Sequence, residues 1–464
     1  MTNEESFPMI VLFMTDSLKA ISPLDGRYAH ITADLRQYVS EYALHQFRIK
    51  IEVWYVEAVL PLVFPHVKIT PQERKKLKEI GDHISEKDIE RIKEIEVETK
   101  HDVKAVEYFL KEQFTKYGLS KYAVCIHLGL TSEDVNNLAY SMMLHACNKK
   151  IIEETLCSLL DEIKQKATQY KSSVMIARTH GQPAVPTTLG KEFANYYVRL
   201  EKLYAKLKEF RFEGKLNGAV GNYNAVQFTF PKVDWIAFSQ KFITSCGLVP
   251  NLFTTQILPT DNYVEYFQIL ERINWVLVGF SQDMWHYIML DLLSQKAEKK
   301  QVGSSTMPQK INPIDFENAE GNLILANSMF ETFARKLLVS RLQRDLSDST
   351  VKRTFGVAFG HMIVAWKSLV RGLHKVDANK EKMSDEVDAH WSVLAEAVQV
   401  YLRAQGNDYA YEKLRMLTQG KKFDKKKFQA LIRSLSKDVY LRLKKLSPQN
   451  YNGLAEKLVD LITH

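Results

Sequence analysis

The chain has 464 residues, of which 45% are apolar and 25% are charged, the balance of an ordinary globular protein. This composition excludes a disordered chain, a collagen-like chain and a small disulfide scaffold. The formal net charge of +8 suits an anionic small-molecule substrate, although charge alone also allows weak contact with nucleic acid. The lysine clusters are short and interleaved with acids, which favours solvated helix faces over a nucleic-acid site. Four scattered cysteines without a C-x-x-C pair indicate reduced thiols in a cytoplasmic protein.

The N-terminal segment contains one apolar run, Phe7–Phe13. This run is far shorter than the ~20 residues of a membrane-spanning helix. It follows Glu4 and Glu5 rather than a basic stretch, so it makes a poor secretory signal. Met14 comes directly after it, and we expect residues 1–13 to be a dispensable extension of a protein without a membrane segment.

The middle of the chain predicts very long helices. Between Gly129 and Gly181 there is no glycine and no proline, and Ser132 is a suitable N-cap. Apolar residues recur there at steps of three and four: Val135, Leu138, Met142, Ala146, Ile152, Leu156, Leu159 and Ile163. About forty residues at ~1.5 Å each span roughly 60 Å, which is too long for one compact domain and indicates a helical bundle.

Three further long helices follow from the same periodicity. The first runs from about Phe193 to Phe210, the second is capped by Thr260, and the third covers residues 322–355. Because few stretches alternate with period two, we predict an all-α fold with minor sheets. The positions at which proline and glycine interrupt the helices suggest three helical domains, residues 1–120, 121–370 and 371–464. The central one is the long-helix bundle. Some of its apolar faces should contact other subunits.

Residues 303–313 (GSSTMPQKINP) interrupt the helices with an unusual composition. Asn312 as N-cap and Pro313 at the first helical position would start a new helix, with Asp315 and Glu317 just inside it. Lys310 would then lie beside a helix N-terminus, where an ammonium and backbone N–H groups form an anion site. Composition alone supports an ordinary polar loop equally well.

A second segment, residues 177–183 (ARTHGQP), places His180 between a threonine and a glycine at the expected end of a helix. A histidine there can transfer protons, but a structural role is more common. Four further segments are individually weak and are explained as well by loops or caps: residues 100–104, 127–137, 217–224 and 341–353. The chain has no G-x-x-x-x-G-K-[ST], G-x-G-x-x-G or H-E-x-x-H motif, so ATP hydrolysis, dinucleotide chemistry and zinc proteolysis lack support. Acid–base chemistry without a cofactor remains.

Taken together, these segments resemble a known superfamily. Residues 303–313 match the signature loop of the fumarase/aspartase superfamily, a highly specific motif. Within it the chain resembles the bacterial type of the adenylosuccinate lyase family. The segments that carry this likeness are 22–28 (SPLDGRY), 100–108 (KHDVKAVEY), 131–138 (TSEDVNNL), 178–182 (RTHGQ) and 344–349 (RDLSDS). The likeness runs from about residue 18 to the C-terminus.

The resemblance implies a homotetramer whose central domains pool their long helices into one tetrameric core. It also implies active sites shared between subunits, without a metal or an organic cofactor, and no nucleic-acid or membrane partner. The implied reactions release fumarate from adenylosuccinate, giving AMP, and from the succinyl-carboxamide ribotide SAICAR, giving AICAR.

The resemblance also assigns roles to single residues. Ser304 would be the general base and His180 the general acid, while Glu317 would orient a catalytic histidine. His101 would lie near the substrate phosphate and support His180. Residues matching phosphate contacts are Arg27, Tyr28, Arg344, Ser349 and Arg353, and those matching succinyl contacts are Thr131, Ser132, Lys310 and Asn312. Gln256 matches a substrate-binding glutamine.

Three alternatives stay open at this point. Another fumarate-releasing lyase, such as an argininosuccinate lyase, is the nearest, although residues 25–28 and 100–102 argue against it. A catalytically silent scaffold would be expected to lack some of the matched polar residues, and all are present. A nucleic-acid-binding protein is supported only by the lysine clusters.

Overall fold

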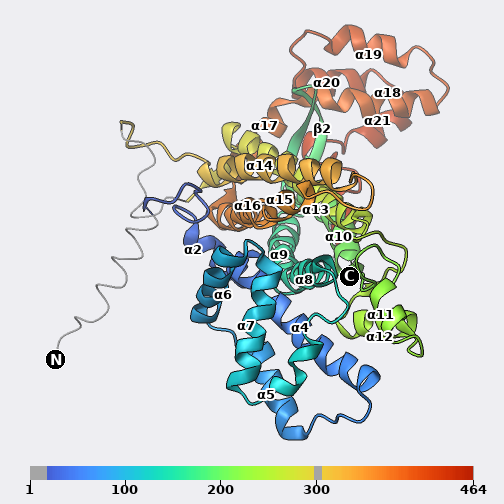
Figure 1. Ribbon diagram of the computed structural model, residues 1–464. Helices are drawn as coiled ribbons and strands as arrows, with labels where there is room; N and C mark the ends of the chain where they lie inside the picture. The colour runs from blue at the N-terminus through green and yellow to red at the C-terminus, as the bar shows by residue number, and fades with distance from the viewer. Residues whose placement is uncertain (1–17, 297–305, 463–464) are drawn as a thin grey trace. The chain divides into compact units, whose positions relative to one another are not determined.

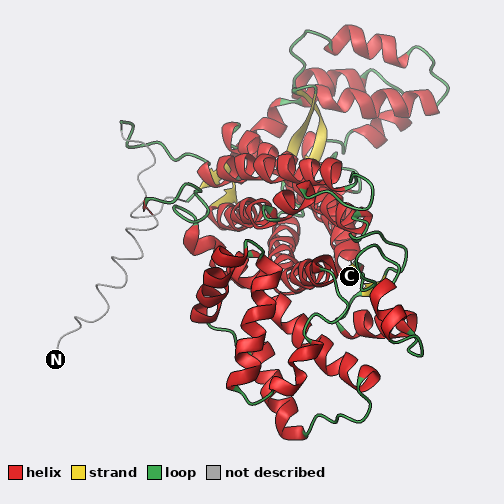
Figure 2. Cartoon of the chain, viewed as in Figure 1, coloured by secondary structure: helices red, strands yellow, loops and turns green. Residues whose placement is uncertain are grey.

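The computed structural model describes residues 18–296 and 306–462 (Figure 1). Helices dominate, and the strands are short (Figure 2). The all-α fold predicted from the apolar periodicity is confirmed. No helix within the described ranges is both long and apolar enough to cross a bilayer.

The chain divides into two compact units, and each draws on three separate stretches of sequence. The first comprises residues 1–156, 203–275 and 321–365, and the second comprises residues 157–202, 276–320 and 366–464. Every boundary between them falls inside a long helix (α9, α10, α13, α14 or α16), so neither unit is a continuous segment. The three-domain division at about residues 120 and 370 stays a prediction.

The helices that begin in the first unit are α2 (Ala29–Thr32), α3 (Arg36–Val39), α4 (Glu41–Val63), α5 (Pro71–Asp82), α6 (Glu86–Thr99), α7 (Asp102–Lys116), α8 (Ser132–Cys147), α9 (Glu153–Gln169), α11 (Asn224–Thr229), α12 (Trp235–Ser245), α13 (Asp261–Met289), α15 (Ser347–Lys352) and α16 (Phe355–Lys375). Its shorter elements are the 3₁₀ turns η1 (Ala33–Leu35) and η2 (Ser120–Cys125), the π turn η3 (Asn148–Ile152) and the parallel pair β3 (Glu213–Gly214) and β4 (Val249–Pro250).

The helices that begin in the second unit are α10 (Leu189–Glu209), α14 (Ile314–Leu337), α17 (Lys380–Ala389), α18 (Ala395–Ala404), α19 (Ala410–Thr418), α20 (Lys425–Arg433), α21 (Lys437–Leu443) and α22 (Ala455–Asp460). Its antiparallel pairs are β1 (Val174–Thr179) with β2 (Gln182–Thr188) and β5 (Leu293–Gln295) with β6 (Val376–Ala378), and its 3₁₀ turns are η4 (Trp391–Leu394) and η5 (Pro448–Asn450).

The long helix predicted after Gly129 is confirmed. Elements α8, η3 and α9 follow one another without a break from Ser132 to Gln169. The π turn begins at the buried Asn148, whose amide donates to the Leu207 carbonyl at 3.3 Å and to Glu153 at 2.8 Å. A buried amide that must satisfy its own hydrogen bonds is a reason for a π turn at this point of the helix.

The single helix predicted over residues 322–355 is wrong. Helix α14 ends at Leu337, and after a loop the chain forms the short α15 before α16 begins. The Asp345 carboxylate accepts the backbone N–H groups of Arg341 at 3.0 Å and Ser347 at 2.8 Å. A short acidic side chain that binds nearby N–H groups competes with the helical hydrogen bonds, so the helix ends although neither glycine nor proline is present.

Aromatic packing forms much of the core of the first unit. Phe267 on α13 packs against Phe355 and Phe359 on α16 and against Phe330 and Phe333 on α14, the Phe267–Phe355 ring centroids lying 4.9 Å apart. Edge-on aromatic pairs of this kind add to the energy of burial. The C-terminal part of the second unit has its own core, to which Val387, Leu394, Val398, Leu414 and Phe428 contribute.

Candidate active site

The predicted site residues fall into both units. His180, Lys310, Asn312 and Glu317 belong to the second unit, and the other described ones belong to the first. The predicted base Ser304 lies outside the described residues. We therefore describe each unit's share of the candidate site separately.

In the first unit, Arg353 is held by an acid. Its guanidinium donates to Asp102 at 3.1 Å, and Asp102 also accepts from the buried Arg48 at 2.8 Å. Burial alone would raise the pKa of Asp102, but Arg48, the Val103 N–H and Arg353 together lower it to about 2. Asp102 is therefore a carboxylate at neutral pH and keeps two guanidinium groups in place.

Arg48 continues this contact chain toward Arg344. The Arg48 Nε donates to the side-chain oxygen Oδ1 of Asn136 at 2.9 Å, and the side-chain amide Nδ2 of Asn136 donates to Glu133 at 3.0 Å. Glu133 in turn accepts from Arg344 at 3.2 Å, and Arg344 donates to Gln256 at 3.0 Å. Arg353, Arg344 and Gln256, which are far apart in sequence, are thus joined by one continuous polar network.

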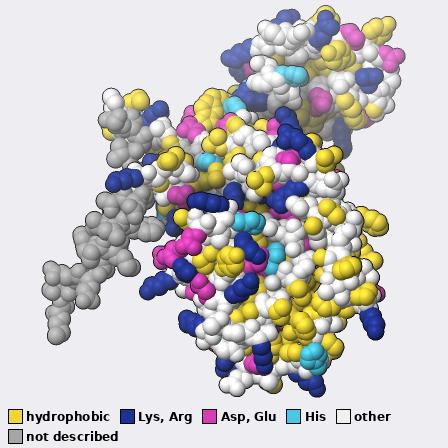
Figure 3. Space-filling view, viewed as in Figure 1, with side chains coloured by type: hydrophobic (Ala, Val, Ile, Leu, Met, Phe, Trp, Pro, Cys, Tyr) yellow, Lys and Arg dark blue, Asp and Glu magenta, His cyan; other side chains and the backbone are white. Residues whose placement is uncertain are grey.

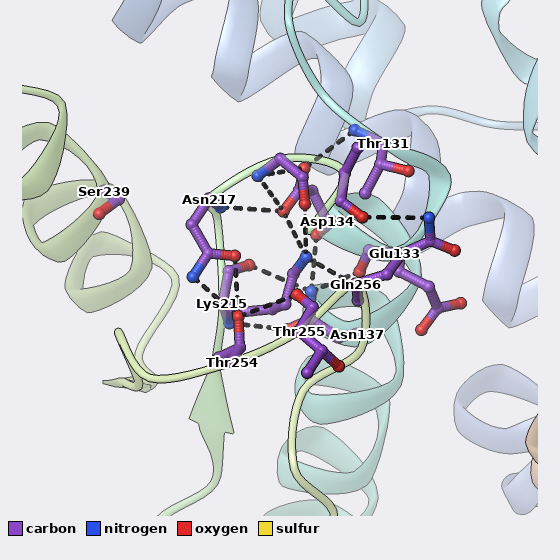
Figure 4. A network of polar contacts seen from close by, with 12 residues as sticks. Thr131, Glu133, Asp134, Asn137, Lys215, Asn217, Ser239, Thr254, Thr255 and Gln256 are labelled. Atoms are coloured by element: carbon purple, nitrogen blue, oxygen red, sulfur yellow. Dashed lines mark hydrogen bonds and ion pairs between the residues drawn. The ribbon is translucent and has the colours of Figure 1, made fainter. Parts of the chain in front are cut away.

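A buried ion pair supports the loop beside Gln256 (Figure 4). Lys215 and Asp134 are both fully buried, and their charged atoms lie 3.1 Å apart. The Lys215 ammonium also donates to the carbonyls of Gly218 at 3.1 Å and Gln256 at 2.7 Å. Asp134 accepts the N–H groups of Asn217 and Gly218 and, at 2.9 Å, that of Thr131. A buried pair with this many additional hydrogen bonds is well compensated, so it orients the loop and the start of α8.

Thr131 and Ser132 lie at the N-terminus of α8. Thr131 is the N-cap residue and Ser132 is the first helical residue, so the cap lies one residue earlier than the Ser132 cap predicted from the sequence. Both side chains are half-buried. Because the first turn of a helix presents free N–H groups, this is a suitable place for a carboxylate of a substrate.

His101 caps helix α7 directly before Asp102. Its Nδ1 accepts the backbone N–H of Lys104 at 3.1 Å, and the ring is about half exposed. A neutral imidazole that accepts through Nδ1 carries its proton on Nε2. His101 can therefore present an Nε2–H donor to a ligand.

The remaining first-unit residues lie at shorter elements. Ser349 is half-buried in α15, one turn before Arg353, while Arg27 is exposed in the turn before α2, and Tyr28 is the N-cap residue of that helix. Joint binding of one phosphate by Arg27, Arg344 and Arg353 stays a prediction.

In the second unit, His180 lies at the tip of the β1–β2 hairpin and not at the end of a helix, so that expectation is wrong. His180 and Gly181 are the two residues between Thr179 and Gln182, and their φ angles are +52° and +74°. A two-residue hairpin loop with both φ values positive has the type I′ geometry, which glycine favours and histidine tolerates better than most residues. The hairpin exposes the His180 ring to solvent.

Lys310, Asn312 and Glu317 flank the start of α14. This helix begins at Ile314, one residue after the predicted first helical position. Lys310 is exposed and Asn312 is half-buried. Glu317 accepts the indole N–H of Trp285 at 3.1 Å, and no contact between Glu317 and His180 occurs in the described part of this single chain. The orienting role of Glu317 stays a prediction.

Sequence reasoning missed the charged residues that hold these side chains. Arg48 and Glu52 lie one turn apart in α4 among buried apolar residues, and both are buried. The Glu52 carboxylate accepts the backbone N–H of His127 at 3.0 Å and contacts its Nδ1 at 2.6 Å. Although burial alone would lower the pKa of His127, the contact with Glu52 raises it above the usual value. The sequence signal that could have identified them is a charged residue at a position of the helix that the apolar pattern assigns to the core.

Chemically, the first-unit network contains groups that bind anions, namely guanidinium groups, an amide and a helix N-terminus. The second unit carries an exposed histidine and an exposed lysine among its predicted site residues. On the face shown in Figure 3, basic and acidic side chains intermingle rather than forming a uniform basic field. This supports recognition of a small anion by a built site more than broad contact with nucleic acid.

Comparisons with known proteins agree with one another. The family model described as "Lyase" matches residues 26–327, and the one described as "Adenylosuccinate lyase C-terminal" matches residues 340–452. The adenylosuccinate lyase of Legionella pneumophila (strain Corby) is 44% identical over 448 residues, which is 96% of this chain and 98% of that protein. That of Escherichia coli (strain K12) is 44% identical over 451 residues, again 96% and 98% of the two chains.

Two solved structures share the fold. A crystal structure of a fumarate lyase from Mesorhizobium sp. BNC1 superposes with a TM-score of 0.73 at 16% identity, covering 93% of this chain and 97% of that one. The 3-carboxy-cis,cis-muconate lactonizing enzyme from Pseudomonas putida gives a TM-score of 0.74 at 19% identity, covering 92% and 96%. At such identities the likeness concerns the fold alone.

Proposed function

This chain belongs to the adenylosuccinate lyase family of the fumarase/aspartase superfamily, and we propose that it releases fumarate from adenylosuccinate, leaving AMP. The observation that carries the proposal is 44% identity to adenylosuccinate lyases along nearly their whole length. We extend the proposal to SAICAR, which carries the same succinyl group on an amide nitrogen and would give AICAR.

The reaction is a β-elimination across a C–N bond. A base removes a proton from the carbon next to a carboxylate, and the resulting aci-carboxylate carries two negative charges. The site must hold donors where this charge develops. Lys310 and the N-terminus of α14 can supply them, since the ammonium precedes the first helical residue by only four positions.

We assign Ser304 as the base and His180 as the acid. A free serine is a poor base, so Ser304 must act as an alkoxide stabilised by the same donors. The departing nitrogen needs a proton, which the exposed imidazole of His180 can donate. No metal or organic cofactor enters this scheme.

The substrate's other groups would be held by the polar network of the first unit. Arg353 and Arg344, each oriented by a carboxylate, suit a phosphate, together with Arg27, Tyr28, Ser349 and the Nε2–H of His101. The succinyl carboxylates and the purine base would be held by Thr131 and Ser132 at the start of α8, together with Asn312 and Gln256.

We further propose a cytoplasmic homotetramer with active sites shared between subunits. Support comes from apolar side chains that one chain leaves exposed on long helices, including Trp275 on α13 and Ile324 and Leu325 on α14. Exposed apolar surface of this kind marks interaction sites in soluble proteins.

The experiment that tests the function is fumarate release from adenylosuccinate by the purified protein, without added metal or cofactor. Argininosuccinate serves as the matched control substrate, because it also yields fumarate by C–N cleavage. Turnover of adenylosuccinate and not of argininosuccinate is expected. The opposite preference, or no turnover of either by a folded protein, would overturn the proposal.

A further inference from the structure

A cluster of potential metal ligands lies where α4 and α6 meet. Glu41 and His45 are one turn apart on α4, and Glu96 comes from α6. One ligand atom from each side chain lies within 4.8 Å of the others. Residues spaced by four on a helix point to the same side, so the first two can bind one ion together.

His45 is unusual because it is a buried polar side chain to which the described part of the chain offers no hydrogen-bond partner. It is only 1% exposed, and neither ring nitrogen has a hydrogen-bond partner within the described structure. A buried imidazole beside two carboxylates, with ring nitrogens that lack partners in the described structure, is placed to act as a ligand to a cation.

Lys93 at present supplies positive charge to this cluster. Its ammonium lies 2.8 Å from a carboxylate oxygen of Glu41 and 2.8 Å from one of Glu96. Neither of these contacts is to His45, and the Lys93 side chain is 42% exposed on a flexible stem. The lysine can therefore move into solvent at small cost.

We propose that Glu41, His45 and Glu96 form a binding site for one divalent transition metal ion of the Zn²⁺ type, which enters by displacing the Lys93 ammonium. One imidazole and two carboxylates are ligands that Zn²⁺ and Co²⁺ accept, whereas Mg²⁺ prefers oxygen alone. The ion would neutralise the two carboxylates and link α4 to α6, leaving a coordination position for water.

The test uses the full chain freed of metal and titrated with Zn²⁺ by calorimetry, and with Co²⁺ by visible absorption. One ion per chain is expected, with the absorption bands of tetrahedral Co²⁺ and a higher Tm in the metal-bound state. His45→Leu, which keeps an apolar volume in the core, should weaken binding by at least ~10–100-fold, as should Glu96→Gln. His66→Leu at an exposed histidine is the matched control and should bind as the unchanged chain does.

Lys93→Met is the sharper variant, because it removes the competing cation and should tighten Zn²⁺ binding several-fold. Lys87→Met, an exposed lysine on the same helix, should have no such effect. Thermal melts of the metal-free variants check that each variant is folded. The proposal is overturned if Zn²⁺ fails to bind, if binding survives His45→Leu, or if Lys93→Met does not strengthen it. None of these readouts depends on lyase activity.

Discussion

Asp102 and Glu133 show how single residues prepare this site for an anion. Each is a carboxylate that holds an arginine predicted to contact the substrate, Arg353 in one case and Arg344 in the other. An arginine already held by an acid loses little side-chain entropy when a phosphate arrives. The acids thus contribute by positioning, not by touching the reacting atoms.

The pKa of Asp102 predicts an acid-sensitive contribution to stability. Its folded-state pKa of about 2 lies below the usual value of 3.8, so the stabilisation is present above about pH 4 and is lost as the pH falls toward 2. At neutral pH this amounts to about 2–3 kcal/mol, from ~1.4 kcal/mol per pKa unit over the shift from 3.8 to about 2. Urea unfolding at several pH values should show Asp102→Asn to be less stable at pH 7 and less acid-sensitive below pH 4. Glu90→Gln, at an exposed position of α6, should follow the unchanged protein.

Ser304→Ala should abolish turnover and leave adenylosuccinate binding intact, because only the proton-abstracting group is removed. Steady-state kinetics and calorimetric titration with adenylosuccinate measure the two effects. Thr306→Ala, at a hydroxyl residue two positions away, is the matched control and should retain activity. Near-normal rates for the serine variant would contradict the assignment of the base.

His180→Asn should lower kcat by at least ~10²-fold, the usual contribution of a general acid. Asparagine accepts a positive φ, so the hairpin turn should survive and the Tm should stay unchanged. A fall in Tm that accompanies the loss of rate would favour a structural role for this histidine.

At the scale of elements, the β1–β2 hairpin is the clearest departure from the helical pattern. Residues 174–188 contain two prolines and carry a positive-φ pair at the turn, which together prevent helix. Residues 338–346 leave the helix for a different reason, since Asp345 binds backbone N–H groups that a helix would use. Both segments carry or adjoin predicted site residues.

Gly181→Ala tests the hairpin turn. An added methyl group meets no atom within 4 Å, so any loss arises from the φ of +74° alone. A non-glycine residue in this region costs about 1–2 kcal/mol, and the Tm should fall accordingly. Gly321→Ala, in the interior of α14 where a methyl group also meets nothing, should raise the Tm slightly or leave it unchanged. Equal effects of the two substitutions would speak against turn strain.

At the scale of the whole molecule, the proposed tetramer predicts the mass of the particle in solution. Light scattering should give about four times the chain mass of 53.6 kDa. Leu325→Glu should lower this mass, because a charge would replace an exposed apolar side chain of α14 that the partner is expected to bury. Leu417→Glu on α19, also exposed and apolar, is the control outside the long helices. A monomeric unchanged protein would contradict the assembly.

The sequence was sufficient for the class of fold, the long helices after Gly129 and near Phe193 and Thr260, and the family of the chain. Those features depend on local periodicity, helix caps and contiguous motifs, all of which a linear pattern contains. The tertiary structure decided the end of α14, the turn that carries His180, and the network from Arg353 through Arg48 to Gln256. These depend on contacts between residues far apart in sequence, and on whether a buried charge finds a partner, which no periodicity encodes. Only the fold, likewise, shows that His45 is buried and has no hydrogen-bond partner among the described residues.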